Sequence, residues 1–287
     1  MGRTMEIYSN MDPMKVGFFL PTFNNLEELK KAINSILPHS VPFVVGVDGS
    51  TDGTIEWLQQ NHYSFLNHPN FENRGRAATR NLAMQLDWDW IIFMDSDMEF
   101  TGNILSFYQN PSNTHIYVGS VRYENKEQNS WLDYCSSRGV NKTKVGVITF
   151  ESFSTGICAV PRPLFQHLKG FDEQFTTYGG EDLEFAIRAK KHHAPFFKSN
   201  DLRVKSSENK PLETALNQMN DFGKTGLRII QKKHPNLAMY GIKSRIPVSF
   251  YSITLKIQDH LPKNLRRMCI HYLVYCSVRR GYYSKSI

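Results

Sequence analysis

The stretch at residues 91–97 constrains the fold of this chain most. Four apolar residues, Ile91 to Met94, are followed at once by Asp95, Ser96 and Asp97. The apolar run predicts a buried strand of a parallel sheet that is covered on both faces. Such sheets bind ligands at the carboxyl ends of their strands, where two like charges repel one another and are costly to desolvate. Because hard divalent cations prefer carboxylate oxygens, the pattern predicts a metal and diphosphate site. An isolated Asp-x-Asp triplet is more often a solvated turn.

Composition narrows the class of protein. The chain has 287 residues, of which 40% are hydrophobic and 21% are charged. These values are typical of a globular protein with one large domain, or one domain and an appendage. No apolar run approaches the roughly 20 residues that span a bilayer, and the first residues lack a signal-peptide core. We therefore expect a cytoplasmic protein whose residues 1–14 form a disordered leader.

The cysteines and the net charge exclude few classes of protein. Cys135, Cys158, Cys269 and Cys276 form no CxxC pair, so we expect reduced thiols in the core and no zinc site. The net charge of +7 is compatible with a nucleotide, a nucleic acid or a membrane surface, and does not choose among them.

Strands and helices are predicted to alternate in the first third of the chain. The pattern predicts strands at residues 15–20, 43–47 and 63–66 and helices at 26–37, 55–60 and 73–81. Such an alternation indicates a mostly parallel sheet flanked by helices, with right-handed crossovers. Three predicted strands end in polar loops, at residues 22–25, 48–52 and 95–97, which form one crevice if they share an edge of the sheet. Neither a Walker phosphate loop nor a GxGxxG fingerprint is present.

The middle of the chain contains a second acidic motif. We predict strands at residues 115–121, 145–150 and 157–160, a short helix at 162–168 and only a connection at 122–144. Gly179 and Gly180 then precede Glu181 and Asp182, which open a helix that runs to about residue 191. Two acids in a first turn complement the helix dipole, but this structural explanation does not account for the glycines, which would let a substrate approach the backbone.

Five segments together resemble glycosyltransferase family 2. They are Asp-Gly-Ser-Thr-Asp-Gly-Thr at 48–54, Asn-Arg-Gly-Arg-Ala-Ala-Thr-Arg-Asn at 73–81, Asp-Ser-Asp at 95–97, Gly-Phe-Asp-Glu at 170–173 and Gly-Gly-Glu-Asp at 179–182. The last two also resemble the catalytic segment of galactosyltransferases and chondroitin synthases. The resemblance covers residues 16–188. It implies a GT-A fold (Rossmann-like, with helices flanking the sheet) over residues 15–210, a nucleotide-sugar donor and an inverting transfer. Residues 211–287 would form a helical C-terminal extension.

The resemblance also implies roles for individual residues on the donor side. Residues that border or contact the nucleotide would be Pro21, Thr22, Asn24, Asp48, Arg76, Arg80 and Asp95. Asp48 would contact the base, and the two arginines would face the nucleotide. Asp97, with Asp95, would bind the divalent metal, Mn²⁺ or Mg²⁺.

On the acceptor side, the resemblance makes Asp182 the catalytic base. Tyr178, Gly180 and Glu181 would bind the acceptor. The chain departs from the family at two places: Val47 replaces a common Asp, and residues 202–206 lack a His that many members use as a further metal ligand. The metal would then be held mainly by Asp97 and the diphosphate.

The last third of the chain allows two interpretations. Apolar residues recur at helical spacing from Leu265 through Met268 and Tyr272 to Cys276, and Arg266, Arg267, Arg279 and Arg280 lie on or near the same helix. The helix packs on the catalytic domain, or it attaches the protein to the inner face of an anionic membrane.

The sequence therefore predicts a metal-dependent inverting glycosyltransferase of surface polysaccharide or lipo-oligosaccharide synthesis. The donor would be a nucleotide-diphosphate sugar, above all a UDP-sugar, and the acceptor a saccharide or lipid-linked saccharide; no nucleic acid is expected. One alternative is a nucleotidylyltransferase, which usually carries a Gly-rich loop after its first strand, whereas residues 21–25 contain no glycine. The other is a non-catalytic module that binds nucleotide sugars or nucleic acid, which an Asp182→Asn substitution would leave unaffected.

Overall fold

The computed structural model describes residues 14–107, 112–124, 129–237 and 247–284. All but Met14 of the predicted leader lies outside the described residues. The first half contains β1 (Val16–Thr22), α1 (Leu26–Ile36), β2 (Phe43–Val47), α2 (Thr54–Gln60), β3 (Phe65–Asn67), α3 (Arg76–Asn81), β4 (Trp90–Met94), β5 (Met98–Phe100), α4 (Ile104–Phe107) and β6 (Ile116–Tyr123). The second half contains α5 (Ser130–Ser136), β7 (Gly146–Ile148), β8 (Ile157–Pro161), α6 (Arg162–His167), α7 (Glu181–Lys191), β9 (Phe196–Ser206), α8 (Leu212–Lys224), α9 (Gly226–Lys233), α10 (Tyr251–Ile257) and α11 (Lys263–Tyr283).

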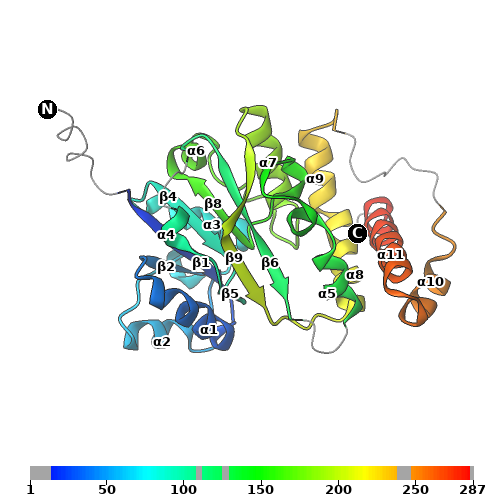
Figure 1. Cartoon of the computed structure of the whole chain (residues 1–287), viewed down its shortest axis with the longest axis horizontal. Helices are drawn as coiled ribbons and strands as arrows, with labels where there is room; N and C mark the ends of the chain where they lie inside the picture. The colour runs from blue at the N-terminus through cyan, green and yellow to red at the C-terminus, as the bar shows by residue number, and fades with distance from the viewer. Residues whose placement is uncertain (1–13, 108–111, 125–128, 238–246, 285–287) are drawn as a thin grey trace, which may run out of the picture.

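One mixed sheet forms the centre of the molecule (Figure 1). Its order is β3-β2-β1-β4-β8-β6-β9-β5, with β7 paired to β9. The strands from β3 to β4 are parallel, β8 is antiparallel to both neighbours, and β6 and β9 are again parallel. The predicted α/β fold is confirmed, and its continuous parallel part is the half of the sheet that precedes β8.

The alternation of side chains along β1 and β4 builds a core on each face of the sheet. Phe18 and Ile92 face one side, where α1 covers them. Phe19 and Phe93 face the other, where residues of α3, α6 and α7 pack. Residues 90–94 are fully buried, which confirms the central strand predicted there. A fully buried Phe or Ile stabilises the fold by about 1.5–3 kcal/mol, so both faces contribute to fixing this strand.

The segment at residues 122–144 differs from the prediction of a simple connection. It contains α5, whose N-terminus is capped by Asn129: the side-chain oxygen accepts hydrogen bonds from the amides of Trp131 at 2.9 Å and Leu132 at 3.2 Å. Such a cap stabilises a helix by about 1 kcal/mol. Trp131 and Leu132 pack with α8 and α11, so α5 joins the sheet to the C-terminal helices (Figure 1).

The C-terminal helices pack on one another and on the main core. α11 buries Ile270, Leu273, Val274 and Cys276, whereas Leu265 and Met268, which were predicted on the same apolar face, are 49% and 68% exposed. The packing interpretation is therefore the one found for the middle of α11. No helix in the described part of the chain is long and apolar enough to cross a membrane, and contact with a membrane surface stays a prediction.

Candidate functional site

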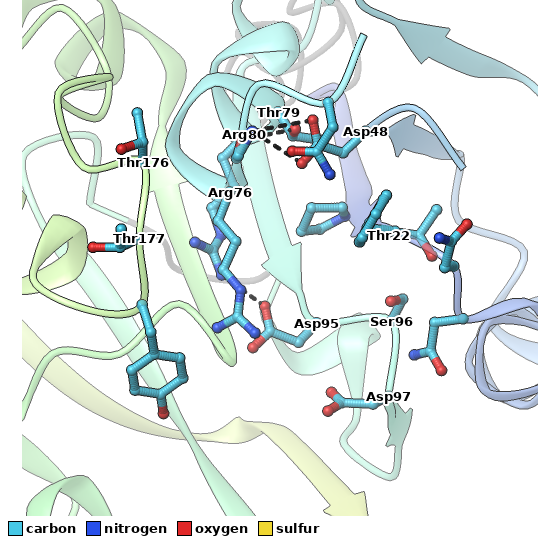
Figure 2. A pocket seen from close by; sticks show the side chains of 17 residues that line it. Thr22, Asp48, Arg76, Thr79, Arg80, Asp95, Ser96, Asp97, Thr176 and Thr177 are labelled. Carbon is cyan, nitrogen blue, oxygen red and sulfur yellow. Dashed lines mark hydrogen bonds and ion pairs between the residues drawn. The ribbon is translucent and has the colours of Figure 1, made fainter. Parts of the chain in front are cut away.

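A pocket of about 470 Å³ lies at the carboxyl ends of β1, β2 and β4 (Figure 2). The structure brings together there all residues predicted to contact the nucleotide, and also Asp97 and Tyr178; the seven are Pro21, Thr22, Asn24, Asp48, Arg76, Arg80 and Asp95. Eight further residues line the pocket that had no predicted role in nucleotide binding: Phe23, Asn25, Asn73, Gly75, Thr79, Ser96, Thr176 and Thr177. Grouping is observed, and the individual roles stay predictions.

The loops after β1 and β2 are held together by side chains. Asn24 has a positive φ of 47°. Its side-chain oxygen accepts a hydrogen bond from the backbone amide of Thr51 at 2.7 Å, and its backbone amide donates one to Ser50 Oγ at 3.0 Å. Asp52 accepts from the Leu26 amide at 2.9 Å and so supplies the polar cap of α1. These bonds give the rim of the pocket a fixed shape.

Asp48 is a buried residue whose carboxylate is already engaged. It accepts hydrogen bonds from the amides of Arg74 at 2.7 Å and Gly75 at 3.1–3.2 Å, and His68 Nε2 lies 3.5 Å away. Asp48 thus fixes the segment that leads into α3. Contact of Asp48 with a base stays a prediction.

Arg80 joins the two acidic motifs. The side chain is 2% exposed, and its guanidinium contacts Asp95 at 2.8 Å and Glu181 at 3.1 Å, with Asp182 at 4.0 Å (Figure 2 shows the bond to Asp95). Burial lowers the pKa of Arg80, but the carboxylates of Asp95, Asp182 and Glu181 outweigh it and raise the pKa above its ordinary value. The contacts observed are therefore with carboxylates, and direct contact with a nucleotide stays a prediction.

Arg76 is placed differently from Arg80. It is exposed, lines the pocket, and its guanidinium lies 5.4 Å from the centre of the Tyr178 ring. Within the described residues it makes no ion pair. Its charge is therefore available to an anionic ligand.

Asp95 and Asp97 have the properties of a partial cation site. Asp97 Oδ1 is buried and has no hydrogen-bond partner among the described residues. Burial, and next the charges of Asp95 and Glu208, raise the pKa of Asp97 to about 6. A divalent cation would relieve both effects, so these carboxylates fit one. The described residues contain no group of three His, Cys, Asp or Glu that could hold a metal, and a diphosphate and water would have to complete the coordination.

Asp182 and Glu181 begin α7 on the other side of Arg80. Asp182 accepts hydrogen bonds from Thr155 Oγ1 at 2.9 Å and from the Thr155 amide at 3.2 Å. Burial first, then Glu181, raises the pKa of Asp182 to about 6, although Arg80 opposes the shift. A carboxylate with such a pKa is ionised near neutral pH and is basic enough to accept a proton. The sequence shows Thr155 in a polar Ser-Thr-Gly turn before a strand, but nothing in it indicates that Thr155 bonds to Asp182.

The glycines before α7 have a conformational reason. Gly179 and Gly180 have φ of +83° and +107°, which side chains rarely adopt. A Cβ on Gly180 would lie 2.7 Å from the ring of Phe175. Close packing against Phe175 therefore accounts for a glycine at position 180. Contact of Gly180, Glu181 and Tyr178 with an acceptor stays a prediction.

Solved structures with the same fold are GT-A glycosyltransferases. The mannosyltransferase PcManGT from Pyrobaculum calidifontis, in complex with GDP-Man and Mn²⁺, is 14% identical over 96% of this chain and 91% of its own, with a TM-score of 0.60. Residues 1–349 of S. aureus TarS, in complex with UDP, are 14% identical over 96% of this chain and 94% of that one, with a TM-score of 0.55. GalNAc-T7 with UDP, GalNAc and Mn²⁺ is 12% identical over 88% of this chain and 55% of that one, with a TM-score of 0.53.

These likenesses, with the pocket at the strand ends, place the fold in the GT-A class. The profile of glycosyl transferase family 2 matches residues 18–164, just over half of the sequence. The chain belongs to glycosyl transferase family 2. The profile named N-terminal domain of galactosyltransferase matches residues 139–204, which include the Gly-Gly-Glu-Asp segment. A search of curated protein sequences found no match.

Proposed function

We propose that the protein transfers a sugar from a nucleotide-diphosphate sugar to a hydroxyl group, with inversion, and that it needs a divalent cation. One observation carries the proposal. Three buried polar atoms without a partner among the described residues, Thr22 Oγ1, Arg80 Nε and Asp97 Oδ1, belong to residues that line the same pocket. Because buried polar atoms almost always have partners, this grouping favours a polar ligand there.

The donor would bind across the three strand-end loops. Support comes from the fold neighbours, which were solved with GDP-Man or UDP. Thr22 and Asn24 would border the nucleoside, and Arg76 would face the diphosphate because its charge is unpaired within the described residues. A cation on Asp97 and Asp95, Mn²⁺ or Mg²⁺, would neutralise the departing diphosphate. A UDP-sugar is the donor that we would test first.

The acceptor hydroxyl would lose its proton to Asp182. The acceptor oxygen forms a bond to the anomeric carbon while the bond from that carbon to the phosphate oxygen breaks, and the nucleoside diphosphate leaves with the electron pair. One base on the face opposite the leaving group gives inversion. Thr155 positions the carboxylate of Asp182 with two hydrogen bonds, and Glu181 is held by Arg80 at the acceptor side.

The biological setting is the less direct part of the proposal. We propose a saccharide or lipid-linked acceptor in surface polysaccharide or lipo-oligosaccharide synthesis, in the cytoplasm. Contact with an anionic membrane is supported by the exposed apolar side chains Phe250, Ile253 and Ile257 of the α10 region, beside the exposed Lys256. Such a combination is typical of interfacial helices.

Thermal stabilisation by nucleotides tests the donor site. UDP, GDP and their sugar conjugates, each with and without Mn²⁺, should be added to the wild type, to Asp97→Ala and to Asp87→Ala. Asp87 is an exposed carboxylate outside the pocket and is the matched control. A ligand at a hundredfold excess over its dissociation constant stabilises the folded state by about 2.7 kcal/mol.

We expect stabilisation by one nucleotide or nucleotide sugar that depends on Mn²⁺, is lost in Asp97→Ala and is kept in Asp87→Ala. A folded wild type that no nucleotide stabilises would contradict the proposed donor site. The nucleotidylyltransferase alternative predicts instead that a nucleoside triphosphate is consumed and pyrophosphate is released.

A further inference from the structure

A second pocket of about 270 Å³ lies between the sheet and the C-terminal helices. Its walls come from β6, α5, the segment before β8 and α8. Aromatic side chains line it, namely Tyr123, Trp131, Tyr134 and Phe153, together with polar side chains, which are Arg138, Asn141, Glu151, Ser152 and Ser154. No predicted donor residue is among its lining residues in the described part of the chain.

The second pocket lies next to the candidate catalytic base. Ser154 lines this pocket, and the following residue, Thr155, binds the carboxylate of Asp182 through its amide and hydroxyl at 3.2 and 2.9 Å. On its other side Asp182 lies 4.0 Å from Arg80, which lines the donor pocket. Asp182 therefore lies between a residue of the donor pocket and a neighbour of the second pocket.

Tyr123 gives an independent link between the two pockets. It lines the second pocket. Burial raises the pKa of its hydroxyl, and the charges of Cys135, Glu208, Tyr178 and Asp97 raise it further. Tyr178 and Asp97 line the first pocket, so groups of both pockets act electrostatically on the Tyr123 hydroxyl.

The chemistry of the lining selects a class of ligand. Trp131 and Tyr134 pack with ring centres 5.5 Å apart, and Arg138 lies 4.7 Å from the Tyr134 ring. Aromatic faces interleaved with hydroxyl, amide and charged groups suit a ring that is apolar on its faces and bears hydroxyls at its edge. The charged lining residues, Arg138 and Glu151, are of opposite sign and both exposed, so no net charge is selected. The volume is below the range of about 300–1,000 Å³ typical of drug-sized ligands, which limits the pocket to about one sugar ring.

We propose that this second pocket binds the terminal pyranose residue of a neutral glycan acceptor and presents its hydroxyl to Asp182. The inference rests on the proposed transferase function, because Asp182 is there the base. It gives α5 and α8 a role in acceptor choice, since they supply Trp131, Tyr134, Cys135 and Met219 to the lining.

Filling the pocket tests the proposal. Ser152→Phe adds a ring to a lining residue, whereas Thr149→Phe adds the same ring at an exposed position three residues earlier, outside the lining. A second variant, Glu151→Ala, removes an exposed side chain and leaves the core intact. The probes are the methyl α- and β-glycosides of glucose, galactose and N-acetylglucosamine. Their binding is measured by saturation-transfer difference NMR, and thermal unfolding checks that each variant is folded.

We expect at least one glycoside to bind the wild type, Thr149→Phe and Asp97→Ala alike. Ser152→Phe should weaken this binding by about tenfold or more, and Glu151→Ala by about threefold to tenfold, in line with the loss of one ordinary hydrogen bond. Binding that both variants leave unchanged, or no glycoside bound by the wild type, would overturn the proposal. Glycoside binding requires no nucleotide, so failure of the nucleotide titration alone would refute the donor site and not this pocket.

Discussion

Replacement of Asp182 by Asn should make the protein more stable and inactive at the same time. The pKa of Asp182 is raised to about 6 from an ordinary 3.8, first by burial and then by the charge of Glu181. Ionisation of Asp182 therefore costs the folded state free energy that it does not cost the unfolded state. Asn resembles the protonated acid in shape, keeps one oxygen to accept from the Thr155 amide, can donate from its NH₂ group to the Thr155 hydroxyl, and carries no charge.

The magnitude follows from linkage. A difference of about two pKa units corresponds to about 3 kcal/mol. Because the side chain is 29% exposed, solvent relieves part of this cost, and we expect a gain of about 1–3 kcal/mol at pH 8. The folded pKa lies above the unfolded one, so the folded form binds more protons between about pH 4 and 6, and wild-type stability falls across that window as pH rises. Below about pH 4 Asp182 is protonated in both the folded and the unfolded state, so the stability gain of Asp182→Asn should vanish.

The assay is denaturant unfolding of the wild type and Asp182→Asn at pH 4, 6 and 8, with Asp87→Asn as the control. Asp87 is exposed and its pKa is lowered by Lys15, so its replacement should give no gain. Nucleotide stabilisation should be unchanged in Asp182→Asn while sugar transfer is lost. Equal or lower stability of Asp182→Asn at pH 8, or a gain that persists at pH 4, would show that the burial argument is wrong.

Four further outcomes are expected. Arg80→Met should destabilise the fold by about 3–5 kcal/mol, measured by denaturant unfolding, because it leaves Asp95 and Glu181 without their buried counter-charge. Arg76→Ala should weaken UDP binding by about tenfold in calorimetry, with little change in stability because the side chain is exposed. Arg74→Ala is the control: Arg74 is also exposed, lies outside the lining and is paired with Glu173, and its replacement should leave UDP binding unchanged. The rate of sugar transfer should fall by about tenfold per pH unit below about pH 6, as Asp182 becomes protonated. Ile253→Asp should reduce flotation with anionic vesicles if the exposed face of α10 contacts a membrane, and equal flotation would refute that contact.

The pocket at the strand ends could be predicted from the sequence because the residues that form it are set by local patterns. Thr22, Asp48 and Asp95 each lie at or directly after the end of a parallel strand. Parallel strands bring these ends to one edge, so recognising the strands is enough to gather the residues. The glycines at 179 and 180 are also a local signal, because each has a positive φ that other residues rarely adopt.

The contacts around Asp182 and Glu181 could not be predicted because they join distant segments. Thr155 and Asp182 are 27 residues apart and Arg80 and Glu181 are 101 apart, and no periodicity records such a pairing. The segment at 122–144 looked irregular because α5 is short and its buried face is completed by α8 and α11. Tertiary packing, more than helix propensity, stabilises such an element.

Arg80 shows how far local and long-range information differ. The sequence places Arg80 near the end of the helix predicted at 73–81 and predicts that it faces the nucleotide, although an exposed position is the ordinary expectation for an arginine. In the structure it is 2% exposed and contacts acids from both motifs, Asp95 of the donor pocket and Glu181 beside the proposed base. A buried pair that loses one partner leaves an uncompensated charge. Asp95 and Glu181 therefore both hold the guanidinium of Arg80 in its buried position. The two motifs are therefore held at a set distance by one side chain, and the proposed transfer would require such a fixed spacing.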